Sequence, residues 1–436
     1  MLVVETAPVY LPEKEYALGV LLRERLGIPF RLSAVDNGRD YTFKTPDGNI
    51  LVVEDHFFGQ IKTETYLEAG NVPDSATQIP HPFIAGETLG LLYGRPYFDD
   101  NRCGVDLVAS TFFMLTRWEE YVKPDRDRHG RFPAAASLAV RSGFLEQPVV
   151  DEYAALLGAW LHRLGYRLPM PDRQFSLHLS HDVDHPLLWW RASDRFKTLS
   201  GSLLKRGSLR EFAFWLRRPA RDPFDTFDWL MDVSERRGLV SRFNFLGKRP
   251  KGSDCWYPFS HPFVQNLIKK IAQRGHEIGF HPSYEAFDDE QKFRQELDSV
   301  RQAAAPAVVR SGRQHYLRFA APHTWQVWAD AGLQTDSTLG YAEAPGFRCG
   351  TCLPFPVFNF LTRQTLPLRE IPLIAMDVSF TNYRDDTPEQ ALRTLNQLRG
   401  QVRKHQGVFT LLWHNSSLDD YYWRHWKPVY ETFVHA

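Results

Sequence analysis

The feature that most constrains this fold is a regular alternation of short apolar segments with amphipathic helical segments in the C-terminal part of the chain. The expected strands are 175–182, 239–247, 276–281, 313–319, 333–338 and 408–414, and the expected helices are 226–238, 261–275, 288–304, 322–332 and 387–407. This alternation predicts an α/β fold in which crossover helices join parallel strands, in an open sheet or a barrel. In such folds the residues that carry chemistry lie at the carboxyl ends of the strands.

The chain divides before this alternation begins. It has 436 residues, which is more than one ordinary domain holds. The segment RLPMPDRQ carries prolines at positions 169 and 171, and it separates a helical stretch from the first expected strand. We therefore expect an N-terminal α+β domain over residues 1–170 and a second domain over residues 171–436.

The N-terminal domain shows ordinary signals of secondary structure and no catalytic constellation. Residues 42–55 are typical of two strands joined by a Pro-Asp-Gly turn, and residues 15–27 and 150–165 are typical of helices that end at glycines. The sequence does not indicate what this domain does.

Composition argues against several classes of protein. Lys and Arg together number 52 and so do Asp and Glu, so no overall charge selects nucleic acid or an anionic membrane, and no nucleic-acid-binding module accompanies the chain. Four cysteines are too few for a disulfide framework in a chain of this length. The first residues do not resemble a secretory signal, and no stretch reaches the roughly 18 apolar residues of a membrane span. A cytoplasmic protein is expected.

Two aspartates close the first expected strand, in the segment LSHDVDHP. Because side chains alternate along a strand, Asp182 and Asp184 share one face with Ser180. Two carboxylates on one face repel each other unless a cation lies beside them, and a metal ion that uses one as a ligand leaves the other available as a base. The alternative is a turn in which the aspartates cap a helix.

Other expected strands also place useful side chains at their carboxyl ends. His281 ends one strand, where a neutral imidazole is a good metal ligand. Another strand carries Arg313, His315 and Arg318, and an arginine near a strand end can hold a carboxylate ionised. His414 ends the last strand and is placed to act as a general acid. Together with the aspartate pair, these residues predict an active site.

These residues stand in motifs that resemble those of the polysaccharide deacetylases, a family of metal-dependent sugar N-deacetylases. SHDVD is similar to the first motif of the family in its Asp-Val-Asp variant, GHEIGFHPS to the second, LRFAAPHTW to the arginine motif and LLWHN to the last. The order and spacing of the motifs match over roughly residues 174–430. The resemblance implies that the second domain is a distorted (β/α) barrel of this type.

The resemblance also implies a role for each motif residue. Asp182 corresponds to the catalytic base, and Asp184 and His281 correspond to metal ligands. Arg318 corresponds to the arginine that orients the base, and His414 to the general acid.

The sequence departs from the family at one metal ligand. The family has a second metal histidine four residues after the first, and here that position holds Glu285. A carboxylate can bind zinc, so we expect Asp184, His281 and Glu285 to hold a divalent metal ion, with zinc the expected ion and His315 the alternative third ligand.

The implied activity is metal-dependent removal of an acetyl group from the nitrogen of a sugar or glycoconjugate. Such an enzyme is a hydrolase of carbon–nitrogen bonds other than peptide bonds. Two alternatives remain open, because a fold does not by itself fix a function. One is a catalytically altered barrel that binds carbohydrate or serves as a scaffold, and the other is an amide hydrolase that needs no metal.

Residues 187–222 follow the Asp-Val-Asp turn and would cover the site. They hold nine Lys and Arg residues against three acids, interleaved with Trp and Phe. A helical hairpin with a solvated basic face is the favoured interpretation. The alternative is contact with an anionic membrane surface or a lipid-linked substrate.

Two other features are set aside as structural. Cys349 and Cys352 form a Cys-Gly-Thr-Cys segment without the context of a redox site or the further ligands of a zinc site. Glu370 and Asp377 lie either near the active site or in ion pairs of the fold.

Overall fold

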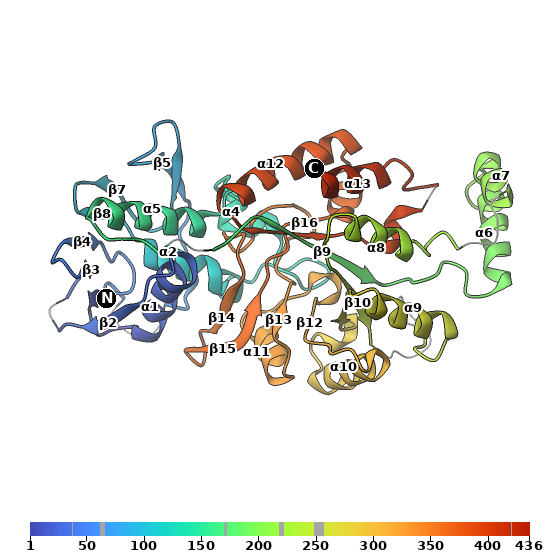
Figure 1. Cartoon of the computed structure of the whole chain (residues 1–436), viewed down its shortest axis with the longest axis horizontal. Helices are drawn as coiled ribbons and strands as arrows, with labels where there is room; N and C mark the ends of the chain where they lie inside the picture. Colours follow the sequence, from blue (N-terminus) through green and yellow to red (C-terminus); the bar gives the residue numbers. More distant parts are fainter. Residues whose placement is uncertain (37, 62–65, 170–171, 218–221, 248–256, 420) are drawn as a thin grey trace. The chain divides into compact units, whose positions relative to one another are not determined.

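The computed structural model describes the chain except for residues 37, 62–65, 170–171, 218–221, 248–256 and 420 (Figure 1). It forms two compact units, of which the first contains residues 1–176, 316–374 and 398–409, and the second contains residues 177–315, 375–397 and 410–436. The boundary expected at residue 170 assigns residues 316–374 and 398–409 to the second domain, whereas their contacts group them with the N-terminal residues.

The first unit is built around a six-stranded mixed sheet with the order β2-β1-β3-β4-β8-β7. The strands of this sheet are β1 (Leu2–Thr6), β2 (Phe30–Ala34), β3 (Tyr41–Lys44), β4 (Ile50–Val53), β7 (Gly94–Phe98) and β8 (Arg102–Val105). The unit also contains the strands β5 (Thr77–Pro80), β6 (Thr88–Leu91), β13 (Thr335–Asp336), β14 (Phe355–Asn359) and β15 (Gln364–Glu370). Its helices are α1 (Leu11–Leu18), α2 (Leu107–Thr116), α3 (Trp118–Val122), α4 (Leu138–Arg141), α5 (Val149–Arg163) and α11 (His323–Asp330).

The local predictions for the N-terminal domain are confirmed. β3 and β4 pair antiparallel across the Pro-Asp-Gly turn, as expected for residues 42–55. The helix expected over residues 15–27 is formed by α1 and the π-helical turn Gly19–Arg25 that continues it, and α5 fills the helix expected over residues 150–165.

The second unit contains the expected strand–helix alternation. Its strands are β9 (Ser176–Val183), β10 (Ser241–Leu246), β11 (Glu277–His281), β12 (Ser311–Gly312), β16 (Ala375–Met376) and β17 (Val408–Leu412), in the order β12-β11-β10-β9-β17-β16. Its helices are α6 (Ala192–Leu204), α7 (Leu209–Arg217), α8 (Phe227–Glu235), α9 (Pro262–Gln273), α10 (Glu290–Ala304), α12 (Pro388–Lys404) and α13 (Lys427–His435). Residues 398–404 of α12 and 408–409 of β17 are grouped with the first unit. β9 pairs parallel with β10, β10 with β11 and β11 with β12, and α8, α9 and α10 provide the three crossovers. The α/β prediction is confirmed at this level.

The prediction of a strand over residues 313–319 is wrong. β12 ends at Gly312, and a short 3₁₀ turn, His315–Leu317, follows it. Tyr316 and Leu317 have φ angles of 60° and 54°, and this left-handed backbone cannot continue an extended strand. The strand end therefore lies beside Arg313 and not beside Arg318.

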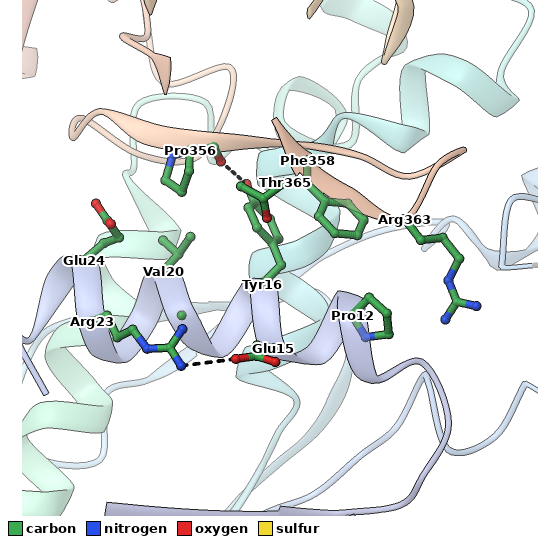
Figure 2. A pocket seen from close by; sticks show the side chains of 11 residues that line it. Pro12, Glu15, Tyr16, Val20, Arg23, Glu24, Pro356, Phe358, Arg363 and Thr365 are labelled. Carbon is green, nitrogen blue, oxygen red and sulfur yellow. Dashed lines mark hydrogen bonds and ion pairs between the residues drawn. The ribbon is translucent and has the colours of Figure 1, made fainter. Parts of the chain in front are cut away.

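A cavity of about 370 Å³ lies in the first unit between α1 and the β14–β15 hairpin (Figure 2). The Tyr16 hydroxyl donates a hydrogen bond to the Pro356 carbonyl oxygen at 2.8 Å across it. Arg23 pairs with Glu15 at 3.2 Å on its rim. Within the described part of the chain, no helix is both long and apolar enough to cross a membrane.

Candidate active site

The register of the parallel strands aligns polar residues at the carboxyl ends of β9, β10 and β11. Asp182 lies opposite Asn244, and Asn244 lies opposite Gly279. The Asn244 side-chain amide donates a hydrogen bond to Asp182 Oδ1 at 2.7 Å. A Cβ atom at position 279 would overlap the Asn244 amide oxygen, so glycine is needed there to leave room for this contact. The neighbouring strands thus fix one oxygen of the Asp182 carboxylate.

A buried arginine holds the same carboxylate oxygen. Arg313, directly after β12, donates to Asp182 Oδ1 at 3.0 Å and to Ser180 Oγ at 2.9 Å. A buried guanidinium in this position keeps a carboxylate ionised and oriented. Because Oδ1 accepts from both Arg313 and Asn244, the second oxygen, Oδ2, is the one that lies near His281, 3.8 Å from its Nε2 atom.

The arginine implied by the family resemblance lies elsewhere. Arg318 belongs to the first unit, where its Nε atom donates to the His129 carbonyl oxygen at 2.9 Å. The backbone reversal at Tyr316 and Leu317 separates it from the strand end. The structure pairs Asp182 with Arg313.

Three potential metal ligands converge beside Asp182. One ligand atom each of Asp184, His281 and His315 lies within 4.8 Å of the other two. His281 Nε2 is 3.3 Å and His315 Nε2 is 3.6 Å from Asp184 Oδ1. Ligands about 2.1 Å from a tetrahedral zinc ion lie about 3.4 Å from one another, so these separations fit a shared ion.

The His281 imidazole is held in the tautomer that a metal ligand requires. Its Nδ1 atom lies 2.6 Å from the Arg313 carbonyl oxygen. A carbonyl oxygen only accepts hydrogen bonds, so Nδ1 carries the proton and the lone pair of Nε2 points into the Asp184 cluster. The same residue, Arg313, therefore holds Asp182 with its side chain and His281 with its backbone.

Glu285 is not part of the ligand group. It lies in the 3₁₀ turn Tyr284–Ala286 with an exposed side chain. The turn is anchored by Glu296 of α10, whose carboxylate accepts from the Ser283 backbone N–H at 2.7 Å and from its hydroxyl at 2.6 Å. His315, the alternative from the sequence, takes the third place in the cluster.

A histidine–aspartate pair lies next to the cluster. His414 follows β17, and its Nδ1 atom is 2.8 Å from Asp377 Oδ1. Asp377 Oδ2 accepts from the His414 backbone N–H at 2.8 Å, which fixes the carboxylate. His414 Nε2 then faces the cluster, 3.7 Å from Asp184 Oδ2.

The electrostatics give these groups opposite protonation states. Burial opposes ionisation of Asp182, but Arg313 and neighbouring histidines outweigh it and hold the pKa of this carboxyl below the ordinary value. Burial also opposes ionisation of Asp184, but His315, His281 and His414 outweigh it and lower the pKa of that carboxyl. Burial also opposes protonation of His414, but Asp377 outweighs it and raises the pKa of His414 to about 10. At neutral pH the site therefore combines an ionised carboxylate with a protonated imidazole, as acid–base catalysis requires.

The structure thus brings together Asp182, Asp184, His281 and His414 of the residues expected from the sequence. It adds Asn244, which appeared in the sequence only as a lone polar residue in the apolar segment FNF. It also assigns a contact to Asp377, which the sequence left open.

The other residues singled out in the sequence lie outside this site. Glu370 accepts from the Trp325 indole N–H at 3.0 Å in the first unit. Cys349 and Cys352 are buried free thiols, and burial raises the pKa of both. Neither belongs to a cluster of metal ligands among the described residues.

Comparison with known proteins adds a family for the N-terminal part. Residues 2–166 match a family of unknown function, DUF7033. No curated protein matches the chain.

Several solved structures are similar to part of the chain. One is a candidate polysaccharide deacetylase from Mycobacterium smegmatis, with 18% identity and a TM-score of 0.39 over 61% of this chain and 85% of that chain. Another is the catalytic domain of a peptidoglycan N-acetylglucosamine deacetylase from Eubacterium rectale, with 14% identity and a TM-score of 0.29 over 61% of this chain and 87% of that chain. A third is a 4-alpha-glucanotransferase from Thermococcus litoralis, with 12% identity and a TM-score of 0.35 over 60% of this chain and 37% of that chain.

Proposed function

We propose that this protein is a metal-dependent hydrolase that removes the acetyl group from the nitrogen of a sugar or glycoconjugate, on a barrel of the polysaccharide deacetylase type. The observation that carries the proposal is the arrangement around Asp184. A cluster of potential metal ligands lies close to both an ionised carboxylate, Asp182, and a protonated imidazole, His414. The order of the SHDVD, GHEIGFHPS and LLWHN motifs along the chain supports the same assignment.

Asp184, His281 and His315 would hold the metal ion. One carboxylate and two neutral imidazoles are a donor set that suits zinc, and catalytic zinc sites use three protein ligands with a fourth position for water. A bound divalent ion polarises the amide carbonyl and lowers the pKa of a bound water molecule. This set replaces the one expected from the sequence, in which Glu285 was the third ligand.

The residues of the chain carry the proton transfers. Asp182 takes a proton from the attacking water at Oδ2, while Arg313 and Asn244 hold its Oδ1 atom. His414 gives the Nε2 proton to the amide nitrogen as the carbon–nitrogen bond breaks, which releases acetate and a free amine. Asp377 keeps His414 oriented and protonated until that step.

The proposal is tested by acetate release from N-acetylglucosamine oligomers. The protein is treated with a chelator, divided, and assayed with and without added zinc, beside the Asp182→Asn variant. Zinc-dependent acetate release that the variant loses supports the proposal. Equal release by the chelated protein would show a metal-independent amide hydrolase, and oligomer binding without release in any zinc-loaded sample would show a carbohydrate-binding protein.

A further inference from the structure

The exposed Leu and Phe side chains of the described residues are concentrated in one place. Among the described residues, six Leu and Phe side chains are exposed, and five of them lie in α6 and α7. The five are Phe196, Leu203, Leu204, Leu209 and Leu216. Leu204 is 86% exposed and Leu209 is 75% exposed, at the junction of the two helices. Figure 1 shows α6 and α7 side by side as a hairpin, here called the α6–α7 hairpin and defined as residues 192–217.

The exposed apolar residues form one stripe on each helix. Phe196 and Leu203 are seven residues apart on α6, and Leu209 and Leu216 are seven residues apart on α7, so each pair lies on one helix face. The inner face of α7 is already occupied, because Trp215 is buried against Tyr421 with ring centroids 5.9 Å apart. The hairpin therefore has a packed face and a separate apolar face directed to solvent.

Cationic side chains flank the apolar stripes. The hairpin holds six Lys and Arg residues against two acids, in a chain whose formal net charge is zero. Arg206 pairs with Glu211, and Lys197 pairs with Asp194. Lys205, Arg210 and Arg217 are exposed and make no ion pair with any described residue. Apolar side chains rimmed by unpaired cations match an anionic lipid surface, which offers both an acyl layer and phosphate groups.

The insertion that contains the hairpin is tied at its base to Asn415, the residue that follows the candidate general acid. The Asn415 side-chain amide donates to the carbonyl oxygens of His185 and Phe224, both at 2.9 Å. These two residues lie on either side of the insertion that contains the hairpin. The Tyr422 hydroxyl donates to Glu211 on α7 at 2.7 Å, which is a second contact from the same C-terminal segment. The segment that follows His414 therefore contacts both the base of the insertion and α7 itself.

We propose that the α6–α7 hairpin docks on the surface of an anionic lipid membrane and keeps the active site next to that surface. The apolar stripes enter the headgroup region, and Lys205, Arg210 and Arg217 contact the lipid phosphates. A solvated basic face, the interpretation favoured by the sequence, would place the Leu and Phe side chains inward, and five of them are exposed instead. Nucleic acid would engage the cations but not the leucines.

The test is sedimentation of the full chain with lipid vesicles. Vesicles of phosphatidylcholine are compared with vesicles of an equimolar mixture of phosphatidylcholine and phosphatidylglycerol, at low and high salt. Binding that requires the anionic lipid and weakens with salt is expected. The variants Leu204→Ser/Leu209→Ser and Lys205→Ala/Arg210→Ala are each expected to lower the vesicle partition coefficient by about tenfold or more.

Matched control variants distinguish vesicle binding through the hairpin from non-specific vesicle binding through other exposed residues. Leu361→Ser removes the sixth exposed leucine or phenylalanine, which lies outside the hairpin, and Lys269→Ala/Arg393→Ala removes two exposed cations from other helices. Both controls are expected to bind vesicles like the wild type.

Three outcomes would overturn the proposal. The first is a wild-type protein that does not sediment with anionic vesicles. The second is binding that the control pairs reduce as much as the hairpin pairs do. The third is self-association that the leucine variants abolish while vesicle binding is absent, because the apolar face would then serve a second copy of the chain. None of these readouts depends on hydrolase activity, so the membrane proposal and the functional proposal can fail independently.

Discussion

Buried charges occur in both units, but their partners are arranged in opposite ways. In the first unit Glu120 accepts from Arg117 Nε at 2.9 Å and from Arg348 at 2.6 Å, so both carboxylate oxygens are paired at hydrogen-bond distance. In the second unit two buried imidazoles approach one oxygen of the partly buried Asp184 at 3.3 and 3.6 Å, longer than direct hydrogen bonds.

This difference distinguishes charged groups that are fully paired within the fold from charged groups that a bound ligand would complete. A saturated pair such as Glu120 with its two arginines needs nothing further, and the same holds for Arg25 with Asp151. Burial without full pairing costs free energy, and a bound cation that joins the three groups would recover it. The comparison predicts that substitutions in the two regions affect different quantities.

The largest effect is expected on catalysis, from Asp182→Asn. The asparagine keeps the shape of the side chain and can still accept from Arg313 and Asn244, but it cannot take a proton. Turnover should fall by about 10²–10⁴-fold, while zinc affinity and the unfolding midpoint change little. Acetate release, zinc calorimetry and thermal melting measure the three quantities. Wild-type turnover in this variant would remove Asp182 from the role of base.

Glu120→Gln should show the reverse pattern. Removing the charge takes the carboxylate partner from buried Arg348 and leaves Arg117 only the more distant Glu119, at 3.8 Å. Breaking a buried ion pair in this way typically costs about 3–5 kcal/mol of unfolding free energy. Urea denaturation measures the loss. Zinc affinity of the folded fraction should stay at the wild-type value. A loss of zinc binding without a loss of stability would contradict the division between the two regions.

The metal ligands themselves are tested by a matched pair of glutamine variants. His315→Gln removes a member of the cluster and should lower zinc affinity by more than the roughly 10–100-fold that loss of a supporting contact costs. Glu285→Gln changes an exposed side chain outside the cluster and should leave the affinity unchanged. Calorimetric titration of chelator-treated protein compares them, and the opposite ranking would restore the ligand set expected from the sequence.

The sequence predicted those parts of the site that sit directly at strand ends. Asp182, Asp184, His281 and His414 follow the regular period of strands β9, β11 and β17, so local pattern places them correctly. The third ligand and the arginine lie elsewhere than expected for separate reasons. Glu285 lies in the exposed 3₁₀ turn that follows β11, and the position of Arg318 depends on where the chain turns after β12. Tyr316 and Leu317 form that turn with left-handed backbone angles. Tyr and Leu rarely adopt this conformation, so their presence in the sequence does not predict it.

The local sequence pattern also did not indicate how the chain divides into its two units. Prolines at positions 169 and 171 mark a real change along the sequence, and the matched family ends at residue 166. Residues 316–374 nevertheless pack into the first unit, and long-range packing of this kind leaves no periodic signal. The exposed apolar face of the α6–α7 hairpin was hidden for the same reason, since composition does not tell which face of a helix is covered.

Two lysine variants test which of the two arginines, Arg313 or Arg318, orients Asp182. Arg313→Lys keeps the charge but cannot reach Asp182 and Ser180 with two separate nitrogens, and kcat should fall by about 10–100-fold. Arg318→Lys alters a contact to the His129 carbonyl in the first unit, and kcat should stay within about twofold of the wild type. Steady-state kinetics with zinc-loaded protein measure both. Equal losses in the two variants would return the orienting role to Arg318.

The smallest effect is expected from Asp377→Asn, and it is a shift on the pH axis. Asp377 raises the pKa of His414 to about 10 against the opposing effect of burial, so removing its charge lowers that pKa toward the ordinary value. The alkaline limb of the kcat/KM profile should therefore move to lower pH, because the general acid loses its proton earlier. A purely structural role for Asp377 would lower the whole profile without moving the limb.

The pH dependence of stability gives a second readout for the same variant. A raised folded-state pKa stabilises the protein fully below the unfolded pKa of about 6.5, and this contribution disappears as the pH rises through about 10. The difference in unfolding free energy between the metal-free wild type and the variant should therefore shrink across that window.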